Sequence, residues 1–172
     1  QTSDLIQALD QGKLDALILP WLDDMTDFEA YDLFEEPFVL AVNKGHVLAK
    51  KKRVKLTDIA GCHVLTLEDG HCLRDQALGY CFSAGADEDK RFQATSLETL
   101  RYMVASGIGI TLLPKLSVID QRENPDIAYI PFQQPSPTRR IVLLIRQNYT
   151  RLETVREIVG AVRKSVKNNL KL

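Results

Sequence analysis

The stretch "ATSLETLRYMVASGIGITLLP", residues 94–114, indicates the fold class because it reads as a helix followed directly by a strand. Thr95 and Glu98 have capping-box spacing, which predicts that a helix begins here. The leucines and the valine that follow recur at helical spacing, and Gly107 is suited to end the helix. The apolar run 108–113 then predicts a strand.

The same alternation continues in both directions along the chain. The run 14–19 is short and almost wholly apolar, which is typical of a strand buried on both faces. Strands alternating with helices predict an α/β fold with a mainly parallel sheet. The other predicted strands are 38–42, 63–67, 91–95, 127–132 and 139–145, and the other predicted helices are 2–11, 72–82 and 151–167.

The composition excludes several classes of protein. The chain has 172 residues, 45% of them apolar, and a net charge of −1, which argues against a disordered chain or a uniformly basic nucleic-acid surface. It contains no apolar run long enough for a membrane span, and its polar start is unlike a signal peptide, so we expect a cytoplasmic protein with no membrane partner. The chain opens on a helix, so we also expect that a preceding strand and helix are missing.

Three cysteines are too few for a secreted disulfide scaffold, and in a reducing compartment any disulfide would be transient and functional. Cys72 and Cys81 lie nine positions apart in a predicted helix, about 13 Å along its axis and on opposite sides. A disulfide needs Cα atoms within about 7 Å, so these two thiols could join only if the helix opened. Such a pair would be a conformational switch.

Cys72 has some features of a reactive thiol. It follows His71, precedes Arg74, and lies where a strand passes into a helix, so peptide N–H groups can stabilise a thiolate. Asp69 and Asp75 oppose this effect. Cys81 stands between two aromatic residues, which suggests a buried thiol.

The alternative interpretation of the cysteines is that they are small buried hydrophobic residues, and Cys62 is best explained in that way. A zinc site is disfavoured, because the chain has no CxxC motif and its histidines and cysteines lack zinc-finger spacing. We therefore expect no metal and no cofactor.

Two long segments, "LEDGHCLRDQALGYCFSAGADED" (67–89) and 94–114, closely resemble the OxyR family of LysR-type, peroxide-sensing transcription activators. Weaker matches, "QGKLDALIL", "LFEEPFVLAV" and "PSPTRRIVLLIR", occur in the expected order. The resemblance implies a periplasmic-binding-protein-like regulatory domain of two Rossmann-like subdomains joined by two crossover strands. One subdomain would comprise 1–36 plus 142–172, and the other 37–141.

The resemblance also implies roles for individual residues. Cys72 corresponds to the peroxidatic thiol and Cys81 to the resolving thiol, and they form a reversible disulfide when oxidised. Cys62 matches no functional position. The residues that match the peroxide pocket are Thr2, His71, Asp75 and Arg139.

The implied partners are hydrogen peroxide, a second copy of this domain, and a glutaredoxin or thioredoxin as reductant. The full-length protein would form a tetramer and contact DNA and RNA polymerase through parts outside this chain. Two other functions stay open: a thiol peroxidase enzyme, disfavoured because the chain lacks the TxxC pattern, and a LysR-type domain that binds a small organic effector between its subdomains.

Overall fold

The computed structural model describes residues 2–69, 72–119 and 124–170, with side chains as far as 168 in the last helix. It divides into two compact units, one made of residues 1–36 and 139–172 and the other of residues 37–138. The second boundary therefore falls at 139, whereas the family resemblance places it at 142.

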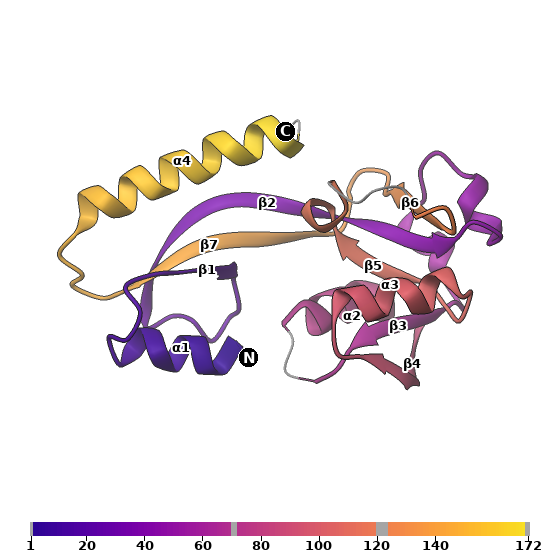
Figure 1. Ribbon diagram of the computed structural model, residues 1–172, viewed down its shortest axis with the longest axis horizontal. Helices are drawn as coiled ribbons and strands as arrows, with labels where there is room; N and C mark the ends of the chain where they lie inside the picture. Colours follow the sequence, from indigo (N-terminus) through magenta and orange to yellow (C-terminus); the bar gives the residue numbers. More distant parts are fainter. Residues whose placement is uncertain (1, 70–71, 120–123, 171–172) are drawn as a thin grey trace. The chain divides into compact units, whose positions relative to one another are not determined.

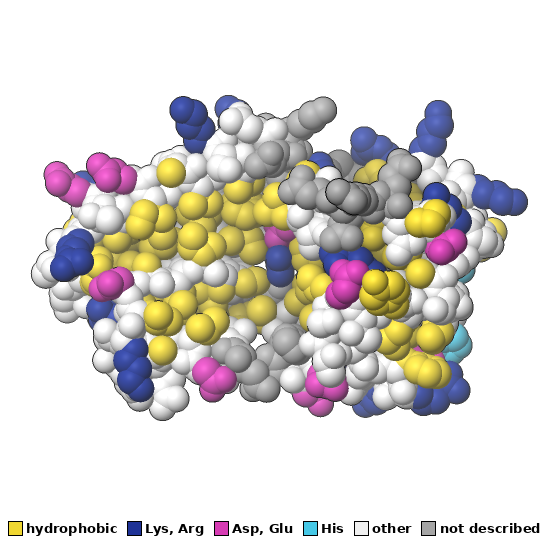
Figure 2. Space-filling view, viewed as in Figure 1, with side chains coloured by type: hydrophobic (Ala, Val, Ile, Leu, Met, Phe, Trp, Pro, Cys, Tyr) yellow, Lys and Arg dark blue, Asp and Glu magenta, His cyan; other side chains and the backbone are white. Residues whose placement is uncertain are grey.

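The first unit is a small sheet with a helix on each face. Its elements are α1 (Thr2–Asp10), β1 (Leu17–Pro20), the first part of β2 (Phe28–Asn43), most of β7 (Thr138–Arg146) and α4 (Leu152–Leu170). In Figure 1, α4 and α1 lie on opposite sides of the ribbon that β2 and β7 form. On the face seen in Figure 2, hydrophobic side chains gather over this ribbon.

The run of apolar residues in β7 follows from this arrangement. Ile141 and Leu143 pack in one cluster with Val155 of α4. Val142 and Leu144 pack in a second cluster that includes Leu9 of α1. Successive side chains of a strand point to opposite faces, so a strand covered by helices on both sides must be apolar at every position.

The second unit carries the remaining elements. They are the rest of β2, short 3₁₀ turns at Val47–Lys50, Leu56–Ile59 and Lys115–Val118, β3 (His63–Leu67), α2 (Cys72–Ser83), β4 (Asp87–Ala94), α3 (Leu97–Ala105), β5 (Thr111–Pro114) and β6 (Ile127–Pro131). β5 and β6 pair with β2, whereas β3 and β4 form a two-stranded sheet.

The expected mainly parallel sheet is wrong. β1 pairs with β7, and β2 with β5 and β6, in antiparallel register, while β3 and β4 are parallel. Strand–helix alternation fixes direction only for strands joined by a helical crossover, as α2 joins β3 to β4. β1 also differs from the expected strand buried on both faces, because it lies at the end of the strand order and leaves Ile18 exposed.

Two local details concern the segment that follows β4. The helix α3 begins one residue later than the capping-box spacing predicts, because Ser96 is its cap and accepts a hydrogen bond from Thr99 N–H at 3.1 Å. After α3, Gly109 passes so close to β3 that an added Cβ would lie 2.7 Å from the carbonyl oxygen of His63. Only glycine fits there, and the approach sets the path of the chain into β5.

Candidate redox site

The helix α2 carries both predicted redox cysteines. Cys72 is its first residue and is half-buried, while Cys81 lies in its last part and is fully buried. The predicted helix is thus confirmed, and its geometry separates the two Cα atoms by about 13 Å along the axis. Both cysteines are free thiols, as this spacing requires.

Cys81 is held in an apolar cluster. The cluster includes Phe38, Ile59 and Ala77, and it leaves the thiol with no exposed surface. Burial disfavours the charged form and raises the pKa of Cys81 to about 12. In the helical state Cys81 is therefore a neutral thiol shielded from solvent, as its aromatic neighbours suggested.

A tyrosine fixes the end of α2 that carries Cys81. The Tyr80 hydroxyl donates a hydrogen bond to the carbonyl oxygen of Thr138 at 2.8 Å and accepts one from the Thr138 N–H at 3.3 Å. Its ring meets Phe38 edge-on, with centroids 6.1 Å apart. Leu78 is also buried, so this end of the helix is anchored mainly by packing.

The end that carries Cys72 is held by charges. Arg74 Nη2 donates to both carboxylate oxygens of Glu88, at 2.9 and 3.0 Å. Arg74 Nη1 lies 3.1 Å from Asp69 Oδ1 and 3.2 Å from Asp75 Oδ1. The positive charge of Arg74 is therefore matched by three carboxylates, including Asp69 and Asp75, which the sequence already sets against its effect on Cys72.

Two side chains besides Arg74 donate hydrogen bonds to the carboxylate of Glu88. Thr66 Oγ1 donates to its carboxylate at 2.8 Å, and Gln93 Nε2 lies at 3.5 Å. Burial by itself raises the pKa of Glu88, but the hydrogen bond from Thr66 and the charge of Arg74 outweigh it, so the pKa is lowered overall. Glu88 is therefore a charged group inside the unit, bound to β3, β4 and α2.

The remaining predicted pocket residues fall in different places. Asp75 lies in the first turn of α2 with Cys72 and is exposed. Thr2, the first residue of α1, and Arg139, in β7, belong to the first unit. His71 lies outside the described residues.

Arg139 forms an ion pair with a buried carboxylate, that of Glu36, which was not predicted from the sequence. Its Nε and Nη2 donate to Glu36 Oε2 at 2.8 and 2.7 Å. The signal was present in the sequence, because Glu36 shares strand parity with the core residues Phe38 and Leu40 in "LFEEPFVLAV". An acidic residue at such a position needs a cationic partner. Glu88 gives no comparable signal, since its strand is polar along much of its length.

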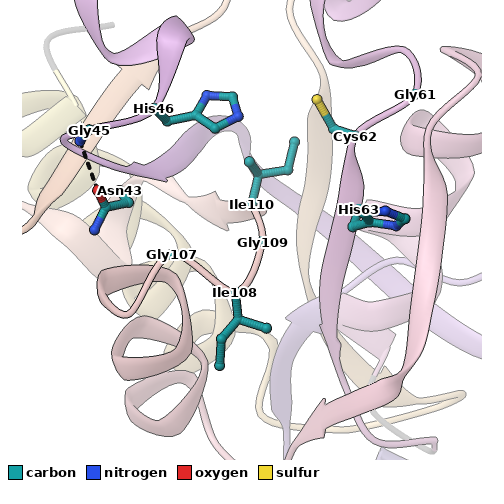
Figure 3. A pocket seen from close by; sticks show the side chains of 10 residues that line it. All are labelled: Asn43, Gly45, His46, Gly61, Cys62, His63, Gly107, Ile108, Gly109 and Ile110. Atoms are coloured by element: carbon teal, nitrogen blue, oxygen red, sulfur yellow. Dashed lines mark hydrogen bonds between the residues drawn. The ribbon is translucent and has the colours of Figure 1, made fainter.

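A cavity of about 540 Å³ opens elsewhere in the second unit (Figure 3). Cys62 is in its wall, and burial raises the pKa of that thiol. Among the polar groups that line the cavity, the Asn43 side chain already has a partner, since its Oδ1 accepts a hydrogen bond from Gly45 N–H at 2.7 Å. The lining residues are Asn43, Gly45, His46, Gly61, Cys62, His63, Gly107, Ile108, Gly109 and Ile110, which include none of the predicted redox residues.

The described part of the chain contains no group of three or more His, Cys, Asp or Glu side chains arranged to hold a metal ion. Within the same residues, no helix combines the length and the apolar character needed to cross a membrane.

A family model for the LysR substrate binding domain matches residues 1–167. The chain belongs to this family. One curated relative is the hydrogen peroxide-inducible genes activator of Pectobacterium carotovorum subsp. carotovorum, 51% identical over 164 residues, which cover 91% of this chain and 54% of that protein. The chain thus spans about half the length of such relatives.

Solved structures of OxyR in two redox states are similar to this LysR-type domain. The oxidised form is 48% identical with a TM-score of 0.82, and the reduced form is 43% identical with a TM-score of 0.84. Each comparison covers 95% of this chain and 77% of the other. The periplasmic-binding-protein-like fold is therefore confirmed, as is the resemblance to peroxide-responsive LysR-type activators.

Proposed function

We propose that this chain is the peroxide-sensing regulatory domain of a LysR-type transcription activator. The observation that carries the proposal is one helix with a half-buried thiol at its start and a fully buried thiol nine residues later. The similarity to OxyR, which has been solved in oxidised and reduced forms, supports it. Both units would then act as regulatory subdomains, with β2 and β7 as the crossover strands.

The chemistry has two balanced steps. The Cys72 thiolate attacks one oxygen of hydrogen peroxide, the O–O bond breaks, and the products are Cys72 sulfenic acid and hydroxide, which takes up a proton to become water. The Cys81 thiol, losing its proton, then attacks the sulfenic sulfur, so that an S–S bond forms and a second water leaves. Because the helix keeps the two Cα atoms about 13 Å apart, the second step requires α2 to open.

Other residues would serve the first step. Thr2, His71, Asp75 and Arg139 would shape the peroxide pocket, with Arg139 supplying a cation and Glu36 holding its guanidinium in place. Opening of α2 exposes apolar side chains that must be reburied. In a pair of such domains this change would repack the contact between copies and reach DNA and RNA polymerase through the rest of the protein. A glutaredoxin or thioredoxin would return the domain to the dithiol state.

Intact-mass measurement and peptide mapping before and after stoichiometric peroxide test this function. We expect one intramolecular bridge between Cys72 and Cys81, no sulfenic acid in Cys72→Ser, and sulfenic acid that accumulates or over-oxidises in Cys81→Ser. Cys62→Ser is the matched control and should behave as the wild type. A dominant bridge through Cys62 would refute the assignment.

Two further measurements separate the two other functions. Sustained turnover of peroxide with a thiol reductant would indicate a thiol peroxidase. A transcriptional response that persists in full-length Cys72→Ser would indicate a domain that responds to an organic effector.

A further inference from the structure

The buried carboxylate of Glu88 connects three elements of the second unit. Its side chain is 3% exposed. It lies on β4, accepts a hydrogen bond from Thr66 on β3 at 2.8 Å, and accepts two from Arg74 on α2 at 2.9 and 3.0 Å. The second carboxylate oxygen is bonded only by Arg74 among the contacts found in the described residues, so the helix contributes a large share of what keeps this charge satisfied.

Arg74 lies within the segment that must open for a Cys72–Cys81 bridge. Its contacts with Asp69 and Asp75 involve exposed carboxylates and are screened by water. Its Nε is buried without a hydrogen-bond partner in the described part of the chain. The contact with Glu88 is therefore the principal buried polar attachment of the first turns of α2, beside the apolar packing of Leu73.

We propose that Glu88 is a positioning residue for the thiol–disulfide reaction, which it opposes by stabilising the reduced, helical state of α2. This inference rests on the proposed function. Glu88 exchanges no atoms in the reaction. The S–S bond forms between Cys81 and the Cys72 sulfenic acid with loss of water, and Glu88 affects only the free energy of the helix that has to open.

The physical reason is the cost of an unpaired buried charge. When the first turns of α2 open, Arg74 moves with them, and the carboxylate of Glu88 keeps only its neutral donors Thr66 and Gln93. Leaving a buried charge without its ionic partner is unfavourable, so the pair penalises the open state. A neutral side chain of the same shape at position 88 removes most of that penalty.

The adjacent residue supplies a matched control. Asp89 is also on β4, is also buried, and also forms a two-point contact with an arginine, Arg91 Nε and Nη2 each at 2.8 Å. Arg91 belongs to the same strand as Asp89 and not to α2. Neutralising Asp89 therefore perturbs the same strand without releasing the redox helix.

The test is the reduction potential of the Cys72–Cys81 couple, measured by mass spectrometry after equilibration in thiol–disulfide buffers. For Glu88→Gln we expect the equilibrium to move about tenfold toward the disulfide, roughly 30 mV more negative. Thr66→Val should not shift it in that direction, since Thr66 donates to Glu88 whether or not the first turns of α2 are open. Asp89→Asn should leave the potential unchanged. An unshifted potential in Glu88→Gln, or an equal shift in Asp89→Asn, would overturn the inference.

A second measurement separates this role from an effect on Cys72 itself. In a Cys81→Ser background, Glu88→Gln should leave the rate of sulfenic acid trapping by a dione reagent unchanged, and a changed rate would also overturn the inference. If the wild-type domain forms no Cys72–Cys81 bridge, the proposed function fails instead.

Discussion

The two ends of α2 are secured by different physical means. The end with Cys72 is tied by ionic contacts from Arg74 to Glu88, Asp69 and Asp75. The end with Cys81 is buried in an apolar cluster and pinned by Tyr80 to the backbone of Thr138.

The two kinds of attachment differ in how easily each end of the helix can be released. The contacts of Arg74 with the exposed Asp69 and Asp75 can be exchanged for water at modest cost, so the buried Arg74–Glu88 pair is the main ionic contact that opposes opening at this end. At the other end, apolar packing is lost only when the core is disturbed. We therefore expect the first turns of α2 to open more readily than the last. Cys72 would stay near solvent, while Cys81 would stay protected until the helix opens.

Alkylation should distinguish the two thiols by at least a hundredfold in rate. Raising the pKa of Cys81 from 9.0 to about 12 lowers its thiolate fraction about a thousandfold at neutral pH, and its burial blocks the reagent as well. Peptide mass spectrometry of the reduced domain during iodoacetamide treatment measures both rates. In denaturant the two rates should converge, and equal rates in the folded domain would contradict the contrast.

Leu78→Ala should lower the free energy of unfolding by about 2–5 kcal/mol, because Leu78 is buried and its loss leaves a cavity at the packed end of the helix. Phe82→Ala, in the same helix but with an exposed ring, should cost less than about 1 kcal/mol. Urea denaturation followed by circular dichroism measures both values. Similar losses for the two variants would show that this end is not held by burial.

Tyr80→Phe should cost about 1–2 kcal/mol, since the hydroxyl satisfies both backbone groups of Thr138. Tyr102→Phe, on the exposed face of α3, provides the comparison and should be close to neutral. The same denaturation experiment applies. A neutral Tyr80→Phe would mean that water replaces the hydroxyl without loss.

Acid should weaken the ionic end of α2 before the packed end. The pKa of Glu88 is lowered in the folded state, so its contribution to stability is present above its unfolded pKa near 4.5 and is lost as the pH falls through the folded value. Between pH 6 and pH 3 the urea midpoint of Glu88→Gln should therefore fall by less than that of the wild type. Identical pH profiles would show that Glu88 does not titrate with folding.

Elements with a clear period could be predicted from the sequence. The strand at 63–67 and the helix predicted over 151–167 were predicted closely, because a short apolar run and apolar residues at helical spacing are local signals. Strand pairing could not be predicted in the same way, because β2 pairs with segments far along the chain and no local pattern carries that information.

The residues of the candidate site differ in the same way in how far the sequence predicts them. The two cysteines could be proposed as a redox pair from their spacing and the family resemblance, whereas the charged partners that hold α2 and Arg139 could not be predicted. Glu36 and Arg139 are 103 positions apart, and Glu88 and Arg74 belong to different elements. Such ion pairs depend on tertiary proximity, which a single sequence does not reveal unless a charge falls on a core-facing position.

The strand β2 runs without interruption from Phe28 to Asn43 and contributes residues 28–36 to one unit and 37–43 to the other. Its alternation places Glu36, Phe38 and Leu40 on the same parity across that boundary. Gaining or losing a single codon there would invert every side chain on one side of the change relative to the other. We therefore expect homologues to vary in this segment by substitution and to keep its length constant.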